Sequence, residues 1–127
     1  MTDVVLDASA VLAFLRREPG GEAVRPHLRG GRLSAVNYSE VLAKAAELGI
    51  AQPIAESAMN ELGVERVPFD DRHAAVAASL RPLTKPYGLS LADRACLALA
   101  TLARLPVLTS DRRWSEAGLE VEVWQIR

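Results

Sequence analysis

The sequence predicts an α/β fold in which helices cover a central, mainly parallel sheet. Short apolar segments alternate with longer helical ones along the chain, an order typical of parallel strands joined by crossover helices. The chain has 127 residues, of which 50% are hydrophobic and 24% charged, an ordinary globular composition. We therefore expect a single domain over 1–127, with a core that needs no disulfide or structural metal.

The first half of the chain begins with an apolar strand and ends with a long helix. The expected elements are strand 4–9, helix 8–21, a short helix 22–31, strand 32–36 and helix 37–49. Pro19 and the glycines after it end the first helix, and Pro26 weakens the second. Gly49 ends the last helix of this half.

The second half repeats the alternation of helix and strand. The expected elements are helix 53–63, strand 64–69, helix 70–83, a loop with Pro82, Pro86 and Gly88, helix 90–105, strand 107–111 and strand 120–126. Pro53 stands in a first turn, where proline is tolerated. No residue from Ala95 to Ala103 is charged, so this helix should be nearly enclosed by protein. The alternating final strand is typical of a sheet edge.

Charge and cysteine content limit the class of protein. The net charge of −1 excludes a positive field over the whole surface, so an anionic partner needs a local patch. The single cysteine, Cys96, cannot form an intramolecular disulfide, which favours a buried thiol and the cytoplasm. Asp3 precedes the N-terminal apolar stretch and Asp7 interrupts it, so we expect no signal peptide. No apolar run approaches the roughly 18 residues of a membrane span.

Four acidic residues are expected at one edge of the sheet. Asp7 follows the first strand, and Asp111 ends strand 107–111. Glu40 falls in the expected first turn of helix 37–49, and Asp93 in that of helix 90–105. Because parallel strands bring their carboxyl ends to a common edge, the four side chains should converge there.

Each acid alone also fits a structural role. Asn37 and Ser90 precede Glu40 and Asp93 by three residues, the separation of a capping box, and the other two acids are placed to cap a following helix or turn. Several carboxylates in one place, however, repel one another unless a cation lies among them. Oxygen ligands of this kind suit Mg²⁺ or Mn²⁺.

Hydroxyl residues accompany two of the acids. Ser9 follows Asp7 by two positions and Thr109 precedes Asp111 by two, where they either orient a carboxylate or hold a water at the metal, or else cap a turn. The only histidines, His27 and His73, have no ligand-like spacing, which disfavours zinc.

Four segments in register resemble the PIN domain, and in particular the VapC toxins of bacterial toxin–antitoxin pairs. These segments are VVLDASAVLAFL, NYSEVLAKA, SLADRACLALA and VLTSDRRW, in the order and spacing of that family. The resemblance implies a three-layer α/β/α sandwich and metal-dependent ribonuclease activity. It matches the four acids to the family's catalytic set, with Asp7 and Asp93 as the most direct metal ligands, and Glu40 and Asp111 completing the shell partly through water.

The same resemblance implies partners. It suggests a homodimer, a VapB-type antitoxin that inserts a C-terminal segment across the acidic site, and a structured substrate such as transfer or ribosomal RNA. Apolar positions of helix 53–63 are available to cover a neighbouring subunit, or else belong to the core. They are Ile54, Ala58, Met59 and Leu62.

Hydrolysis by a metal-activated water predicts products with 5′-phosphate and 3′-hydroxyl ends. Arginines next to the acids or at the end of the first helix are predicted to hold the RNA backbone, or else are solvated surface residues. They are Arg16, Arg17, Arg94, Arg112 and Arg113.

Three other functions are alternatives to a nuclease, and the sequence disfavours two of them. An aspartate-nucleophile phosphatase needs a second aspartate where this chain has Ser9, and a phosphoacceptor receiver needs a lysine at a late strand end, whereas the only lysines are Lys44 and Lys85. A non-catalytic PIN-like module that binds RNA or protein is the alternative to the enzyme.

Overall fold

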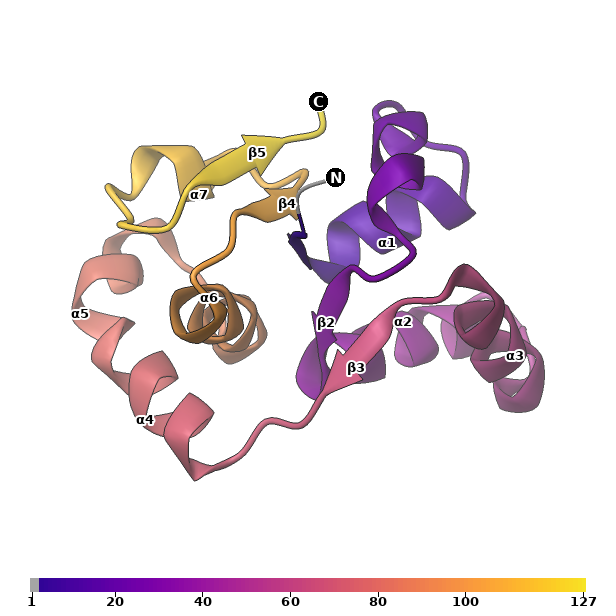
Figure 1. Cartoon of the computed structure of the whole chain (residues 1–127), viewed down its shortest axis with the longest axis horizontal. Coiled ribbons are helices and arrows are strands. Elements are labelled where there is room, and N and C mark those ends of the chain that lie inside the picture. The colour runs from indigo at the N-terminus through magenta and orange to yellow at the C-terminus, as the bar shows by residue number, and fades with distance from the viewer. Residues whose placement is uncertain (1–2) are drawn as a thin grey trace.

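A computed structural model describes residues 3–127 and contains one five-stranded sheet (Figure 1). The strands are β1 (Val5–Leu6), β2 (Arg32–Ser34), β3 (Glu65–Val67), β4 (Val107–Thr109) and β5 (Val123–Gln125). Their order is β3-β2-β1-β4-β5, and every neighbouring pair is parallel. The predicted parallel sheet is therefore confirmed, and β5 lies at an edge, as its alternating sequence indicates.

Helices connect these strands on both faces of the sheet. They are α1 (Ala8–Leu15), η1 (Gly21–His27), α2 (Ala35–Glu47), α3 (Gln52–Leu62), α4 (Asp71–Ser79), α5 (Arg81–Thr84), η2 (Lys85–Tyr87), α6 (Leu91–Ala103) and α7 (Arg113–Glu116). None of the helices in the described part of the chain is both long and apolar enough to pass through a membrane.

The alternation of side chains along β1 separates two cores. Val4 and Leu6 point to a core shared with α1, η1, α2 and α3, whereas Val5 points to a core shared with α6 and Trp114. Successive strand residues face opposite sides of a sheet, so one short buried strand contributes to both. Helices thus pack on each face, which confirms the three-layer α/β/α architecture (Figure 1).

Helix α6 has the enclosure that its sequence predicts. Ala95 to Ala100 are all buried, and the Cys96 thiol lies among them. The helix begins with a complete capping box between Ser90 and Asp93. Burial raises the pKa of the Cys96 thiol well above its ordinary value, with the carboxylates of the neighbouring acids as further causes, so the thiol stays protonated.

Several predicted boundaries differ from the structure. Helix α1 ends at Leu15, four residues before Pro19, because Arg17 adopts a positive φ of 54° and the chain turns back there. The short helix 22–31 is the 3₁₀ helix η1, with Pro26 inside it. The expected loop before α6 contains the helical turns α5 and η2, and the sequence analysis missed α7.

Helix α2 begins earlier than predicted, at Ala35. Its N-cap is Ser34, whose Oγ accepts a hydrogen bond from the Val36 N–H, so Asn37 lies inside the helix and does not cap it. Glu40 consequently stands in the second turn and not the first.

Candidate metal and nuclease site

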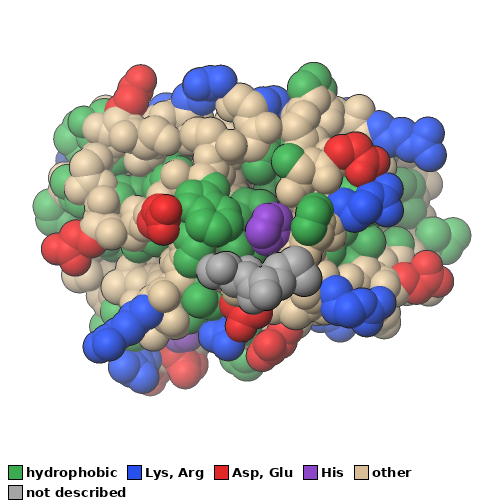
Figure 2. All heavy atoms as spheres, turned by 45° about the horizontal axis from the view of Figure 1, so that its top comes forward, with side chains coloured by type: hydrophobic (Ala, Val, Ile, Leu, Met, Phe, Trp, Pro, Cys, Tyr) green, Lys and Arg blue, Asp and Glu red, His purple; other side chains and the backbone are tan. Residues whose placement is uncertain are grey.

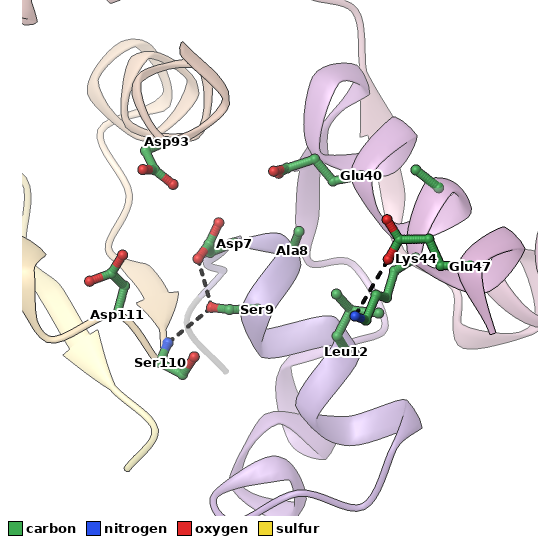
Figure 3. A pocket seen from close by; sticks show the side chains of 11 residues that line it. Asp7, Ala8, Ser9, Leu12, Glu40, Lys44, Glu47, Asp93, Ser110 and Asp111 are labelled. Carbon is green, nitrogen blue, oxygen red and sulfur yellow. Dashed lines mark hydrogen bonds and ion pairs between the residues drawn. The ribbon is translucent and has the colours of Figure 1, made fainter. Parts of the chain in front are cut away.

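A cavity of about 570 Å³ lies at the point of the sheet where the order in which strands are added changes side. Strands β2 and β3 extend the sheet on one side of β1, and β4 and β5 extend it on the other, so β1 and β4 flank a topological switch point. The residues that line the cavity come from the ends of β1 and β4 and from the helices α1, α2 and α6. They are Asp7, Ala8, Ser9, Leu12, Glu40, Ala43, Lys44, Glu47, Asp93, Ser110 and Asp111. The four predicted acids therefore share one cavity, and their carboxylates face a common space (Figure 3).

Asp7 is the most enclosed of these acids, with 5% of its surface exposed. The Asp7 N–H donates to the Leu108 carbonyl (2.9 Å), which continues the pairing of β1 with β4 and fixes the side chain at their common end. Asp7 also precedes α1, but its side chain makes no capping hydrogen bond to that helix. Its carboxylate is thus available to the cavity.

The hydroxyl groups of Ser9 and Thr109 orient the Asp7 carboxylate. Both donate to Oδ2, at 2.6 and 2.9 Å, and no hydrogen bond from residues 3–127 reaches Oδ1. The Ser110 N–H donates in turn to Ser9 Oγ, and the Asp111 N–H to Thr109 Oγ1, both at 3.0 Å. This network joins the loops after β1 and β4 and leaves one carboxylate oxygen free.

The environment of Asp7 disfavours its charged form. Burial is the largest cause and raises the pKa of Asp7 from 3.8 to about 6, although the two hydroxyl hydrogen bonds act in the opposite direction. The negative charges of Asp93 and Glu40 raise the pKa further. A cation in the cavity would relieve both effects.

Glu40 is held by a buried asparagine that also contacts α6. The Asn37 side-chain amide donates to Glu40 Oε1 (2.9 Å) and to the Ala92 carbonyl (3.0 Å), next to Asp93. Asn37 is fully buried whereas Glu40 is exposed, so only the asparagine end of this link is shielded from water. It sets Glu40 relative to the helix that carries Asp93, a role that its three-residue spacing alone did not reveal.

Asp93 and Asp111 have partners of their own. Asp93 Oδ2 accepts the Ser90 N–H (2.8 Å) as part of the capping box, so this side chain caps α6 and also lines the cavity. Both oxygens of Asp111 accept hydrogen bonds from the Arg113 guanidinium, which lowers the pKa of Asp111. The same guanidinium lies 3.8 Å from Asp93 Oδ2.

The cavity is rich in carboxylates, the type of ligand that hard divalent cations prefer. Within residues 3–127, no group of three or more His, Cys, Asp or Glu side chains has the arrangement of a metal site. Five carboxylates line the cavity against one ammonium group, however, which leaves a negative excess that a cation would offset. Magnesium retains several waters and prefers oxygen ligands, which suits carboxylates spread around a cavity of this size.

The sequence did not lead us to predict two charged residues that line the cavity. Lys44 and Glu47 lie on the same face of α2 as Glu40, four and seven residues later, and their side chains pair at 3.5 Å (Figure 3). The helical spacing i, i+4, i+7 was the available signal.

The five predicted RNA-binding arginines have different surroundings. Arg16 pairs with Glu18, Arg94 donates to the Ala77 carbonyl, and Arg113 pairs with Asp111. Arg17 and Arg112 are exposed, and neither forms an ion pair with residues 3–127. None of the five lines the cavity.

The surface carries a mixed pattern of charge. Basic and acidic side chains are interspersed over the face drawn in Figure 2, without a broad basic area. This pattern agrees with the near-zero net charge. Neither His27 nor His73 lines the cavity.

A second, apolar groove of about 210 Å³ adjoins the acidic cavity, and Leu12 lines both. Exposed side chains along it include Leu48 and Ile54, with exposed fractions of 50% and 64%. Met59, in contrast, is fully buried in the core. Of the apolar positions singled out on this helix, Ala58 is half-buried in the groove and Leu62 packs against the core.

Comparisons with known proteins agree with this architecture. A family model described as PIN domain matches residues 4–119. None of the curated proteins matches the chain in sequence.

Solved structures are similar over nearly the whole chain. A toxin–antitoxin complex from Klebsiella pneumoniae is 19% identical with a TM-score of 0.78, and covers 98% of both chains. FitAcB from Neisseria gonorrhoeae is 26% identical with a TM-score of 0.75, and covers 97% of both. DNA-bound VapBC from Salmonella typhimurium is 15% identical with a TM-score of 0.74, and covers 100% of both.

Proposed function

The chain belongs to the PIN domain family, and from this we propose that it is a Mg²⁺- or Mn²⁺-dependent endoribonuclease, the toxin of a VapBC-type toxin–antitoxin pair. The observation that carries the proposal is the convergence of Asp7, Glu40, Asp93 and Asp111 on one cavity at the switch point of the sheet. A non-catalytic PIN-like module does not require four acids around a cavity that contains so little positive charge.

Asp7 and Asp93 would hold the metal most directly, with Glu40 and Asp111 acting partly through water. When bound, the metal supplies Lewis acidity that favours ionisation of water and offsets charge on the phosphate. Ser9 and Thr109 keep the Asp7 carboxylate in one orientation, with Oδ1 left for the cation. Asn37 does the same for Glu40.

Cationic side chains near the cavity would hold the RNA backbone. Lys44 lines the cavity itself, and its ion pair with Glu47 is partly exposed and therefore weak enough for a phosphate to compete with it. Arg17 and Arg112 are exposed and free to contact phosphates outside the cavity. Such contacts position RNA without selecting its sequence.

Cleavage of transfer or ribosomal RNA in Mg²⁺ or Mn²⁺ tests the proposal. We expect cleavage to fall to background in excess chelator and to return with Mg²⁺, because without the cation four carboxylates repel the phosphate and nothing lowers the pKa of the attacking water. End labelling should show 5′-phosphate and 3′-hydroxyl termini. Cyclic phosphate ends, or cleavage that persists in chelator, would contradict the metal mechanism; RNA binding without cleavage would favour the module.

We also propose an antitoxin partner whose apolar segment occupies the groove beside Leu48 and Ile54. Because Leu12 lines both hollows, a segment in the groove reaches the acidic cavity directly. The similar VapBC and FitAcB structures support such a partner. We expect a homodimer as well, which native mass spectrometry at micromolar concentration would check.

Co-purification with the product of a short reading frame beside this gene tests the groove. Ile54→Asp should weaken the complex at least about tenfold, because it places a charge in an apolar contact. Ser57→Asp, an exposed position on the same helix, is the matched control and should leave it unchanged. Equal affinities for the two variants would place the partner elsewhere.

A further inference from the structure

Arg113 surrounds the Asp111 carboxylate with donors. Its Nε donates to Oδ1 (2.9 Å), its Nη2 to Oδ2, and its own backbone N–H to Oδ1 (3.0 Å). Bidentate pairs of this kind are the stronger and more directional arginine–carboxylate contacts. A cation at Asp111 would therefore share this carboxylate with a guanidinium, whose positive charge opposes its binding.

The other end of the guanidinium is anchored to the loop before α6. Nη1 donates to the carbonyl oxygens of Tyr87 and Gly88, at 3.1 and 3.2 Å, and Nη2 lies 3.8 Å from Asp93 Oδ2. Arg113 thus connects Asp111, which follows β4, to the loop before α6 and to Asp93 in the first turn of that helix. Its positive charge lies within ion-pair distance of both Asp93 and Asp111. No arginine or lysine of residues 3–127, in contrast, pairs with Asp7 or Glu40.

We propose that Arg113 is an internal counter-cation that competes with the divalent metal for Asp111 and Asp93. The inference rests on the proposed function and concerns the same site. Guanidinium remains charged at every accessible pH, so the competition does not depend on protonation. The charge of Arg113 then opposes metal binding at these two acids, and a substrate phosphate, which binds guanidinium in the same bidentate manner, can draw Arg113 away.

An opposite role for Arg113 is that of a clamp that keeps Asp111 in place for the metal. The two roles predict opposite changes in metal affinity when Arg113 is replaced. A competitor weakens metal binding, so its removal tightens binding, whereas a clamp strengthens metal binding, so its removal weakens it. The measurement is therefore the affinity for Mn²⁺ in the absence of RNA.

Calorimetric titration with Mn²⁺ of the wild type, Arg113→Gln, Arg113→Lys and Arg112→Gln tests the proposal. We expect Arg113→Gln to bind Mn²⁺ roughly twofold to fivefold more tightly, the upper part of the range for one partly exposed ion pair. Arg113→Lys keeps the positive charge but loses the bidentate contact with Asp111. Its affinity for Mn²⁺ should therefore lie between those of Arg113→Gln and the wild type. Arg112→Gln removes the same charge one residue away and should change the affinity less than about twofold.

The controls separate failure of this inference from failure of the proposed function. Asp7→Asn should lose Mn²⁺ binding; if the wild type also binds none, the metal proposal itself fails. If the wild type binds Mn²⁺ but Arg113→Gln binds equally or more weakly, Arg113 is no competitor and the inference is overturned. Equal tightening by Arg112→Gln would also overturn it, because general charge would then explain the effect.

Discussion

Asp7→Asn is expected to abolish metal-dependent RNA cleavage, with a loss of about three orders of magnitude or more. Asp7 is the acid at the centre of the hydroxyl network, and its Oδ1 is the oxygen left for a cation. An amide keeps the shape and still accepts hydrogen bonds from Ser9 and Thr109, but it is a poor ligand for a hard cation. The rate of cleavage at saturating Mg²⁺ is the measurement.

The fold should survive this change. Asparagine removes a charge whose burial is unfavourable, so the melting temperature of Asp7→Asn in chelator should equal or exceed that of the wild type. Asp3→Asn, the same replacement at an exposed position four residues earlier, should cleave RNA at the wild-type rate. Cleavage retained by Asp7→Asn with its metal dependence intact would remove Asp7 from the site.

The location of the acids was predictable because it depends on topology. Asp7 and Asp111 follow strands, and parallel strands bring their ends to a common edge whatever the loops do. Asp93 was placed correctly because the Ser90 capping box determines where α6 begins. Strand ends and capping boxes are local signals, and each allows few positions for the acid that it carries.

The errors have physical causes as well. Ser34 and Asn37 are both favourable N-caps, and the sequence alone did not show that the chain leaves β2 at Ser34 and enters α2 directly. The pairing of Arg113 depends on carbonyl groups of Tyr87 and Gly88, more than 20 residues away, whose direction follows from the turn η2. Contacts of this kind depend on tertiary structure, and no regular spacing of residues in the sequence indicates them.

Metal-free protein should lose stability as the pH rises from 4 to 7.5, by about 3 kcal/mol from Asp7 alone. The folded pKa of Asp7 is about 6 and the ordinary value is 3.8, so the unfolded chain releases its proton first. Below pH 3.8 both states are protonated and the contribution is fully present. Between the two values the folded state binds more protons than the unfolded state, so the free energy of unfolding falls, and above pH 6 the loss is complete.

Urea denaturation in chelator across this pH range, on the wild type and Asp7→Asn, isolates the contribution of Asp7. Other acids shift in the opposite direction, such as Asp111 beside Arg113, but they are common to both proteins and cancel in the difference. The difference in stability between the variant and the wild type should grow as the pH rises from about 4 to 6 and stay constant above that. Mg²⁺ should restore the stability of the wild type at pH 7.5 and leave the variant unchanged, because only the carboxylate binds it. Parallel curves for the two proteins would mean that burial does not raise the pKa of Asp7, and that the cavity holds this carboxylate charged without a metal.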